Sequence, residues 1–268
     1  MEYLIAVDLE GIHNVVGVKY ELFSNAPDFA LSKQNAEKEV NAAIKALFDS
    51  GASKVAVWDN HAGGGNLDFS KIDPRATEIV GARENRRRMD FAEAHNFAGI
   101  LYIGYHSREG TIGGVLAHTF NGLEIQYVKI NGQAVGEMDI DSYIAADHGM
   151  APIFASSDDK GIMQVKQLSP NIVTVITKFG EGRHSAQFRD EQTVLDEIYE
   201  GVCRAVKTKA KKIHLKAPAE VEIRYTRAVI AEDMLARAKE ADIPARYSED
   251  SHTIIYEISK ANDIPYLL

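Results

Sequence analysis

The sequence predicts an α/β fold in which helices flank a mainly parallel sheet, with a smaller α+β unit at the C-terminal end. In the first half, short apolar runs alternate with stretches of helical periodicity, the pattern of βαβ units. Asn131-Gly132, between two extended runs, is a strong hairpin signal and marks a change in the middle of the chain. From these patterns we expect a larger α/β domain over 1–190 and a smaller α+β domain over 191–268.

The first half provides three strands of the predicted sheet. The apolar run Leu-Ile-Ala-Val at 4–7 is the first, and strands over 54–58 and 99–104 follow. Ser32 is the expected cap of a helix that Gly51 ends. Between the second and third strands, the sequence predicts a short extended run at 77–80 and a polar helix over 84–95.

The second half predicts a hairpin and then renewed alternation. A strand over 123–130 turns at Asn131-Gly132, and Glu137 begins a helix that Gly149 ends. The remaining expected elements are strands at 152–155 and 172–177, helices at 159–168 and from Asp190 to about Val206, and a tail of strand 221–225, helix 228–241 and strand 251–258.

Composition limits the possible partners and locations. A net charge of −9 in 268 residues argues against nucleic acid and anionic membrane surfaces, which select basic proteins. No apolar stretch approaches the roughly 18 residues of a membrane span, and the N-terminus enters a strand directly, so we expect a soluble, cytoplasmic protein. The single cysteine, Cys203, excludes a disulfide framework, so any metal must be bound by histidines and carboxylates.

Charged and imidazole side chains follow three of the predicted strands. Asp8 and Glu10 come directly after the first strand, His61 follows the second, and His106 follows the third. Because the carboxyl ends of parallel strands meet at one edge of a sheet, we expect these side chains to lie together. Burial of two like charges requires compensation, which a cation provides.

Together with Glu137, these residues form a set of nitrogen and oxygen ligands that suits zinc or a similar divalent ion. Five ligands are too many for one tetrahedral zinc with an open position, but they suit two metals that share a carboxylate. Each residue alone also has an ordinary explanation. Glu137, for example, lies at a helix start, where the dipole favours acidic residues.

Five sequence blocks in order also resemble a known family, the zinc-dependent D-aminopeptidases, which are dinuclear metallopeptidases. The blocks are Val7-Asp8-Leu9-Glu10-Gly11-Ile12, Asp59-Asn60-His61, Gly104-Tyr105-His106, Gly114-Val115-Leu116-Ala117-His118-Thr119 and Ile130-Asn131-Gly132-Gln133-Ala134-Val135-Gly136-Glu137. Beyond about residue 190 the resemblance is slight.

The resemblance implies a role for each matched residue. It implies that Asp8 bridges two zinc ions, that Glu10, His61, His106 and Glu137 complete their coordination, and that His118 is catalytic. His118 would be the nucleophile by the resemblance, while the residues alone leave a proton shuttle or an oxyanion stabiliser open. The family also implies a homo-oligomer, with a ring enclosing the active sites as one form.

Several residues near the expected substrate-binding end of the site each allow two interpretations. His13 stands where the family usually has a small residue, and is either a polar group of the site or a loop residue. Gly63–Gly65 is either a cradle for a substrate carboxylate or a flexible loop. Lys178 and Arg183 are either partners of a peptide carboxylate or surface charges. Asp59 either orients an imidazole or is an ordinary turn residue.

We therefore expect a dinuclear zinc aminopeptidase that removes the N-terminal residue, including a D-amino acid, from short peptides or amino-acid amides. Another metal-dependent amide or ester hydrolase is the alternative within the enzyme class. A non-catalytic α/β protein that binds a small ligand is the alternative outside it.

Overall fold

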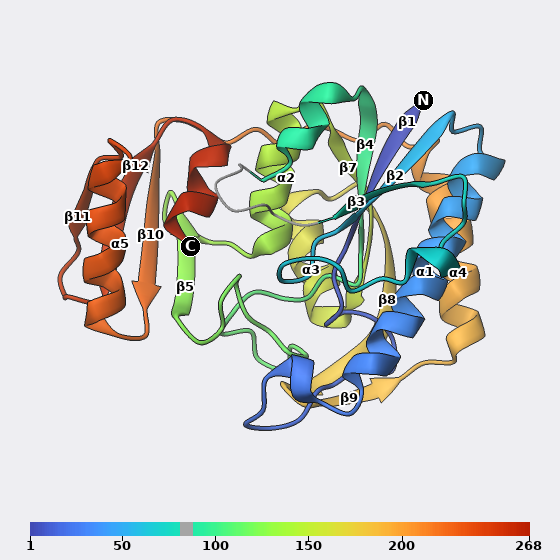
Figure 1. Ribbon diagram of the computed structural model, residues 1–268, viewed down its shortest axis with the longest axis horizontal. Coiled ribbons are helices and arrows are strands. Elements are labelled where there is room, and N and C mark those ends of the chain that lie inside the picture. Colours follow the sequence, from blue (N-terminus) through green and yellow to red (C-terminus); the bar gives the residue numbers. More distant parts are fainter. Residues whose placement is uncertain (81–87) are drawn as a thin grey trace.

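The computed structural model describes residues 1–80 and 88–268, and within these residues it contains two sheets (Figure 1). The central sheet has the strand order β3-β2-β1-β4-β7-β8-β9. The second sheet has the order β11-β12-β10-β5-β6 and lies at the left of Figure 1. The predicted fold class, a mainly parallel sheet flanked by helices with a smaller α+β part, is confirmed.

The central sheet is parallel at every strand pair except the last, β8 with β9. Its strands are β1 (Glu2–Val7), β2 (Lys54–Asp59), β3 (Thr77–Val80), β4 (Phe97–Ile103), β7 (Ala151–Asp158), β8 (Val173–Gly182) and β9 (Ser185–Phe188). β1 lies in the middle, where Leu4 pairs with Ala56 on one side and Ile100 on the other. Both faces of β1 are covered, which explains its continuous apolar run.

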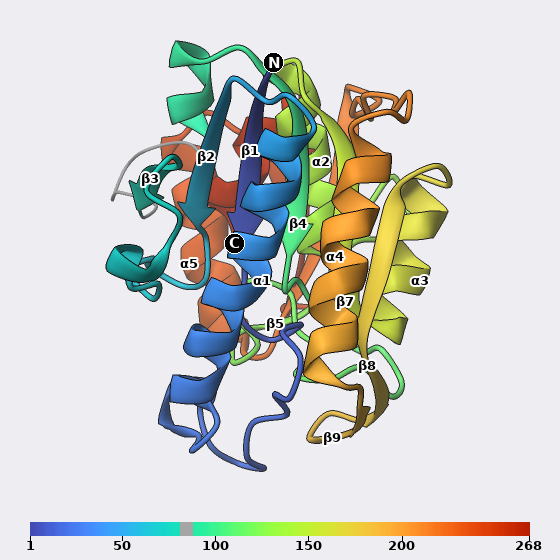
Figure 2. The same cartoon turned by 90° about the vertical axis from the view of Figure 1, so that its right-hand side faces the viewer.

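Four helices cover the two faces of the central sheet. α1 (Phe29–Asp49) and α4 (Glu191–Ala205) lie over one face, in front of the strands in Figure 2. α2 (Glu137–Asp147) and α3 (Asp159–Leu168) lie over the other. Alternate residues of β1 serve the two sides, because Ile5 packs with the α1 and α4 side chains and Leu4 packs with those of α2 and α3.

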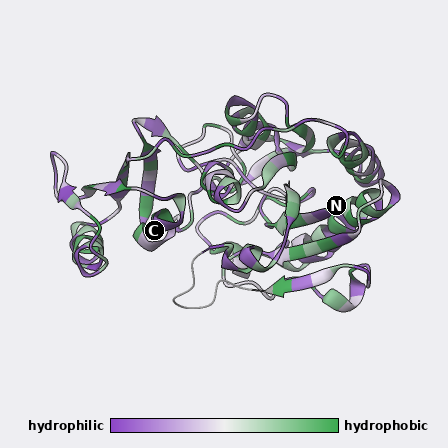
Figure 3. Cartoon of the chain, turned by 90° about the horizontal axis from the view of Figure 1, so that it is seen from above, coloured by the Kyte–Doolittle hydropathy of each residue, from purple (hydrophilic) through white to green (hydrophobic). Residues whose placement is uncertain are grey.

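The second sheet is antiparallel throughout and takes strands from two parts of the chain. Its elements are β5 (Ile125–Ile130), β6 (Gln133–Ala134), β10 (Ala219–Tyr225), β11 (Ala245–Tyr247), β12 (Thr253–Ile258) and the helix α5 (Ala228–Glu240). Figure 3 shows both apolar and polar residues on α5, which buries Ile230 and Met234. The division into domains at residue 190 stays a prediction.

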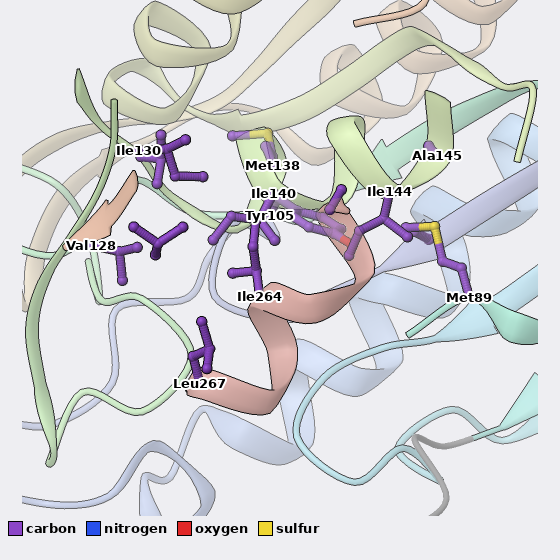
Figure 4. Close-up of a cluster of buried hydrophobic side chains, with 14 of the residues drawn as sticks. Met89, Tyr105, Val128, Ile130, Met138, Ile140, Ile144, Ala145, Ile264 and Leu267 are labelled. Atoms are coloured by element: carbon purple, nitrogen blue, oxygen red, sulfur yellow. The ribbon is translucent and has the colours of Figure 1, made fainter. Parts of the chain in front are cut away.

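One buried cluster joins the second sheet to the face of the central sheet that α2 and α3 cover (Figure 4). A 3-10 helix at the C-terminal end, Ala261–Leu267, contributes Ile264 and Leu267. Ile264 lies beside Ile140 of α2 in Figure 4, and the same cluster includes Leu267 as well as Val128 of β5. The core therefore crosses between the two sheets.

Two predicted helix boundaries are wrong. α1 begins at Phe29, and Ser32 lies inside it with its hydroxyl donating to the Phe29 carbonyl. The helix starts early because the Asp28 carboxylate accepts from the Val16 and Gly17 amides, a tertiary contact that fixes the preceding turn. Of the helix predicted over 84–95, residues 84–87 lie outside the described part. The rest contains only the 3-10 helix Asp90–Ala94.

Among the described residues, none of the helices combines the length and apolar character needed to cross a bilayer.

Candidate active site

The ends of β1, β2 and β4 bring the predicted site residues together because the loops after β1 and β4 touch. The Gly11 amide donates to the Gly104 carbonyl at 2.7 Å. A Cβ at Gly11 would lie 1.8 Å from the Tyr105 carbonyl oxygen, and Gly104 has a φ of +70°. Only glycines permit this approach, which places the residues after the two strands side by side.

All five predicted ligands lie in one cluster. The Nδ1 atom of His61 is 2.9 Å from Asp8 Oδ1 and 3.1 Å from Glu10 Oε2. The Nε2 atom of His106 is 3.4 Å from Asp8 Oδ2 and 3.2 Å from Glu137 Oε1. Glu137 reaches the cluster from the first position of α2. The convergence expected from the strand ends is therefore present in the structure.

His118 joins this cluster from the loop that precedes β5. Its ring stacks on His106, with centroids 4.0 Å apart and planes 11° from parallel. Its Nε2 atom lies 3.8 Å from Glu137 Oε1 and 4.0 Å from Glu10 Oε1. Leu116 and Phe120, on either side, have φ values of 50° and 58°. Such left-handed conformations are costly for non-glycine residues and are typical of functional loops.

The hydrogen bonds of His118 determine its tautomer. Its Nδ1 atom lies 2.9 Å from the Leu116 carbonyl oxygen, which can only accept, so Nδ1 carries the proton. In the neutral ring, Nε2 then presents a lone pair to the cluster. Burial lowers the pKa of His118, and the neighbouring His106 lowers it further, so the neutral form is favoured.

The rest of the cluster has an excess of negative charge. Burial and the adjacent Glu10 raise the pKa of Asp8 to about 7. Burial opposes a charge on the imidazoles, but the carboxylates overcome it: Glu10 and Asp8 raise the pKa of His61 to about 11, and Glu137 and Asp8 raise that of His106 to about 10. In the protein alone, protons on these histidines balance the carboxylates, a role that a bound cation also fulfils.

The geometry and donor chemistry fit a divalent metal. The ligand atoms of Asp8, Glu10 and His106 lie within 4.8 Å of one another, and so do those of His106, His118 and Glu137. His106 Nδ1 donates to the Ser107 carbonyl, while its buried Nε2 has no hydrogen-bond partner among the described residues. When a cation replaces the proton on Nε2, this buried atom presents a lone pair among the carboxylates, which is the expected arrangement of a metal ligand.

Asp59 and His13 belong to the surrounding structure. Asp59 accepts from the amides of Asn66 and Leu67, so it is a turn residue and does not orient His61. His13 is fully buried between α1 and α4, with Nδ1 2.7 Å from Glu39 and Nε2 3.1 Å from Glu191. His13 is therefore not a polar group of the site.

Lys178 is neither a partner of a peptide carboxylate nor a surface charge. Its side chain is fully buried, and its ammonium donates to the carbonyl oxygens of Glu10, Ile12 and Val15 at 2.6–2.7 Å. Lys178 therefore holds the loop that follows Asp8 and Glu10. Gly63 and Gly65 have open space around them, since an added Cβ would meet no atom within 4 Å.

Sequence reasoning missed a buried ion pair that connects the motif loops. Asp141 of α2 accepts hydrogen bonds from Arg88, from the Tyr105 hydroxyl at 2.8 Å and from Asn60 at 3.4 Å. Tyr105 and Asn60 directly precede His106 and His61. The available signal was the four-residue spacing of Glu137 and Asp141, which places two acids on one face of a helix.

A pocket of about 820 Å³ opens beside the cluster. Glu10 and His118 lie in its wall, together with Arg183 and His184 from the turn between β8 and β9. Its other lining residues are Lys19, Tyr20, Glu21, Leu22, Phe23, Leu116, Phe120, Asn121, Gly122 and Leu123. A small, partly apolar ligand can reach His118 through this pocket.

Known proteins resemble this chain in both sequence and fold. A D-aminopeptidase from Bacillus subtilis (strain 168) is 28% identical over 180 residues, which are 66% of this chain and 64% of that protein. The match thus spans just under two thirds of the relative. The solved structure of the Zn-dependent D-aminopeptidase DppA from Bacillus subtilis, described as a self-compartmentalizing protease, superimposes with a TM-score of 0.87 at 22% identity, covering 100% of this chain and 95% of that one.

The family model for D-aminopeptidases matches residues 1–263, so it extends well past residue 190, beyond which the sequence resemblance is slight. This match covers both sheets and every residue of the cluster described above. The chain therefore belongs to the D-aminopeptidase family of peptidases.

Proposed function

We propose that this protein is a zinc-dependent aminopeptidase that removes the N-terminal residue, including a D-amino acid, from short peptides or amino-acid amides. The observation that carries the proposal is the neutral His118 imidazole, whose Nε2 lone pair faces a buried cluster of carboxylates and histidines beside a pocket. Family membership and the likeness to a Zn-dependent D-aminopeptidase support the choice of reaction and metal.

Asp8, Glu10, His61, His106 and Glu137 would hold two zinc ions, with Asp8 as the bridge. Asp8 is suited to this position because its two oxygens face different histidines, Oδ1 toward His61 and Oδ2 toward His106. When bound, the ions supply Lewis-acid polarisation of the scissile carbonyl and a binding site for the free α-amino group.

His118 acts as the nucleophile. Its Nε2 lone pair forms a bond to the scissile carbonyl carbon, the C–N bond breaks, and the leaving amine takes a proton from water. Hydroxide from that water then cleaves the acyl-imidazolium, which releases the amino acid and restores the neutral ring. The Leu116 carbonyl keeps the proton on Nδ1 and so keeps Nε2 available.

Hydrolysis by the zinc-loaded protein tests the proposal. We expect release of the N-terminal residue from D- or L-aminoacyl p-nitroanilides and dipeptides, with Asp8→Ala as the inactive control. His118→Ala should abolish turnover and leave the zinc content near that of the wild type. Fewer than one zinc per chain together with no hydrolysis would favour a binding protein, and a normal kcat in His118→Ala would exclude the nucleophile assignment.

We also propose that copies of the chain form a homo-oligomer, as a ring that encloses the active sites in the cytoplasm. The self-compartmentalizing description of the similar structure supports this assembly. Tyr20 and Leu123, both at the pocket, are 92% and 69% exposed, which suits burial against a second copy. Light scattering tests this part, and a monomer at micromolar concentration would contradict it.

A further inference from the structure

Arg183 is tied to the loop that carries His118. It lies in the turn between β8 and β9, and its side chain lines the pocket. Its Nη1 atom donates to the Ala117 carbonyl, and its own carbonyl accepts from the Leu116 amide at 2.8 Å. These two contacts, to the residues just before His118, fix the guanidinium relative to the imidazole.

Gly122 lies close to both side chains. A Cβ at this position would lie 3.1 Å from His118 Cβ and 3.6 Å from Arg183 Nη2. The guanidinium and the imidazole therefore flank the same point, and no side chain of residue 122 separates them. The Cβ atom of His118 and the Nη2 atom of Arg183 are therefore no more than about 7 Å apart, the length of two extended residues.

The guanidinium retains donors for a further anion. Its nearest carboxylate among the described residues is Glu109, whose Oε2 lies 3.8 Å from Nη1, beyond hydrogen-bond distance. The other oxygen of Glu109 accepts from the Gly110 amide at 3.0 Å. The Arg183 side chain is 48% exposed, so a ligand in the pocket can reach it and displace water from it.

We propose that Arg183 binds the C-terminal carboxylate of a short peptide whose scissile carbonyl lies at His118. The inference rests on the proposed function and narrows its substrates to peptides with a free carboxylate one or two residues beyond the cleaved bond. A planar guanidinium matches a carboxylate through two parallel hydrogen bonds, so the loss of the anion or of the planar fork weakens recognition. Longer peptides lose this contact because their carboxylate lies outside the pocket.

The test compares D-alanyl-D-alanine with its C-terminal amide, which differs only in the anionic carboxylate. For wild type, Arg183→Gln, Arg183→Lys and the remote control Arg246→Gln, kcat/KM is measured for both probes, and binding of both is measured by calorimetry. We expect Arg183→Gln to reduce the acid-to-amide ratio of kcat/KM by about 10- to 100-fold. Arg183→Lys, which keeps the charge without the fork, should give an intermediate ratio, and Arg246→Gln should match the wild type.

An unchanged acid-to-amide ratio of kcat/KM in Arg183→Gln would overturn the proposal. Equal losses of kcat/KM on the two probes would then indicate a purely structural role, and no loss on either would indicate no role. Thermal unfolding of each variant shows whether it is folded. If Arg183→Gln does not fold, the acid-to-amide ratio of Arg183→Lys provides the test. If the wild type hydrolyses neither probe, the proposed function fails, while the acid-to-amide ratio of binding affinities still decides the role of Arg183.

Discussion

At the scale of single residues, Asp8 and Glu10 differ in the groups they connect. Asp8 lies between His61 and His106, so its loss removes a neighbour from both imidazoles. Glu10 contacts only His61 closely, with His118 at 4.0 Å. In the proposed site, Asp8 would therefore serve both metals and Glu10 only one.

We expect Asp8→Ala to retain almost no zinc and Glu10→Ala to retain about one ion per chain. Mass spectrometry of the metal content after gel filtration makes the measurement, with the wild type at about two ions. Equal losses in the two variants would contradict a bridge at Asp8.

His13 is a second residue with a specific expected behaviour. Burial opposes its charge, but Glu39 and Glu191 outweigh burial and raise its pKa above 6.5. Two cations face the same carboxylates: Lys38 binds Glu191 at 2.9 Å, and the buried Lys178 interacts electrostatically with Glu39. Because the folded pKa exceeds the unfolded one, the stabilisation is complete below about pH 6.5 and is lost as the pH rises through the folded value.

The His13→Gln variant isolates this effect. The difference in unfolding free energy between wild type and variant should be largest near pH 6 and should shrink toward pH 9. Urea denaturation at a series of pH values provides the measurement, with the exposed His214→Gln as the matched control. A difference that grows with pH would have the wrong sign for a protonated His13.

At the scale of elements, Asp141 connects α2 to the loops after β2 and β4. Its carboxylate is fully buried and pairs with Arg88, whose side chain is only 10% exposed and lies over the Trp58 and Phe120 rings. Removal of one member of a buried ion pair leaves an uncompensated charge. The Asn60 and Tyr105 side chains also lose their charged acceptor.

We expect Asp141→Asn to lower the free energy of unfolding by about 3–5 kcal/mol. The exposed Asp147→Asn, at the end of the same helix, should change it by less than about 0.5 kcal/mol. Urea denaturation measures both. Similar small effects in the two variants would show that the Arg88–Asp141 pair does not stabilise the fold.

At the scale of the whole molecule, the shared core predicts that the two sheets unfold together. Side chains of the second sheet, the C-terminal 3-10 helix and α2 pack in one cluster with Trp58 and Tyr102 of the central sheet. Trp58 is the only tryptophan and lies on β2, so its fluorescence reports on the unfolding of the central sheet. Far-UV circular dichroism reports on both sheets.

The two signals should give coincident urea transitions in the wild type. Ile264→Ala, which removes a fully buried side chain from the shared cluster, should shift both transitions by the same amount, about 2–5 kcal/mol. A circular dichroism transition that precedes the fluorescence transition would instead show that the second sheet unfolds independently of the central sheet.

The sequence by itself determined the fold class, the order of the main elements and the candidate ligand set. Apolar runs that end in charged residues identify buried strands and the sheet edge where those residues meet, because both depend on local hydrophobic pattern and on the geometry of parallel strands. The predicted start of α1 was wrong because Asp28 forms tertiary contacts that no local propensity reveals.

Only the tertiary structure decided the roles of Lys178, His13 and Asp141. Each is a charged or titratable residue whose partners lie far away in the chain, such as Lys178 and the Glu10 carbonyl, 168 positions apart. Such a residue is costly to bury alone and is stabilised when distant groups meet it. These partners, like His118 and Arg183 on either side of Gly122, come together only when the chain is folded.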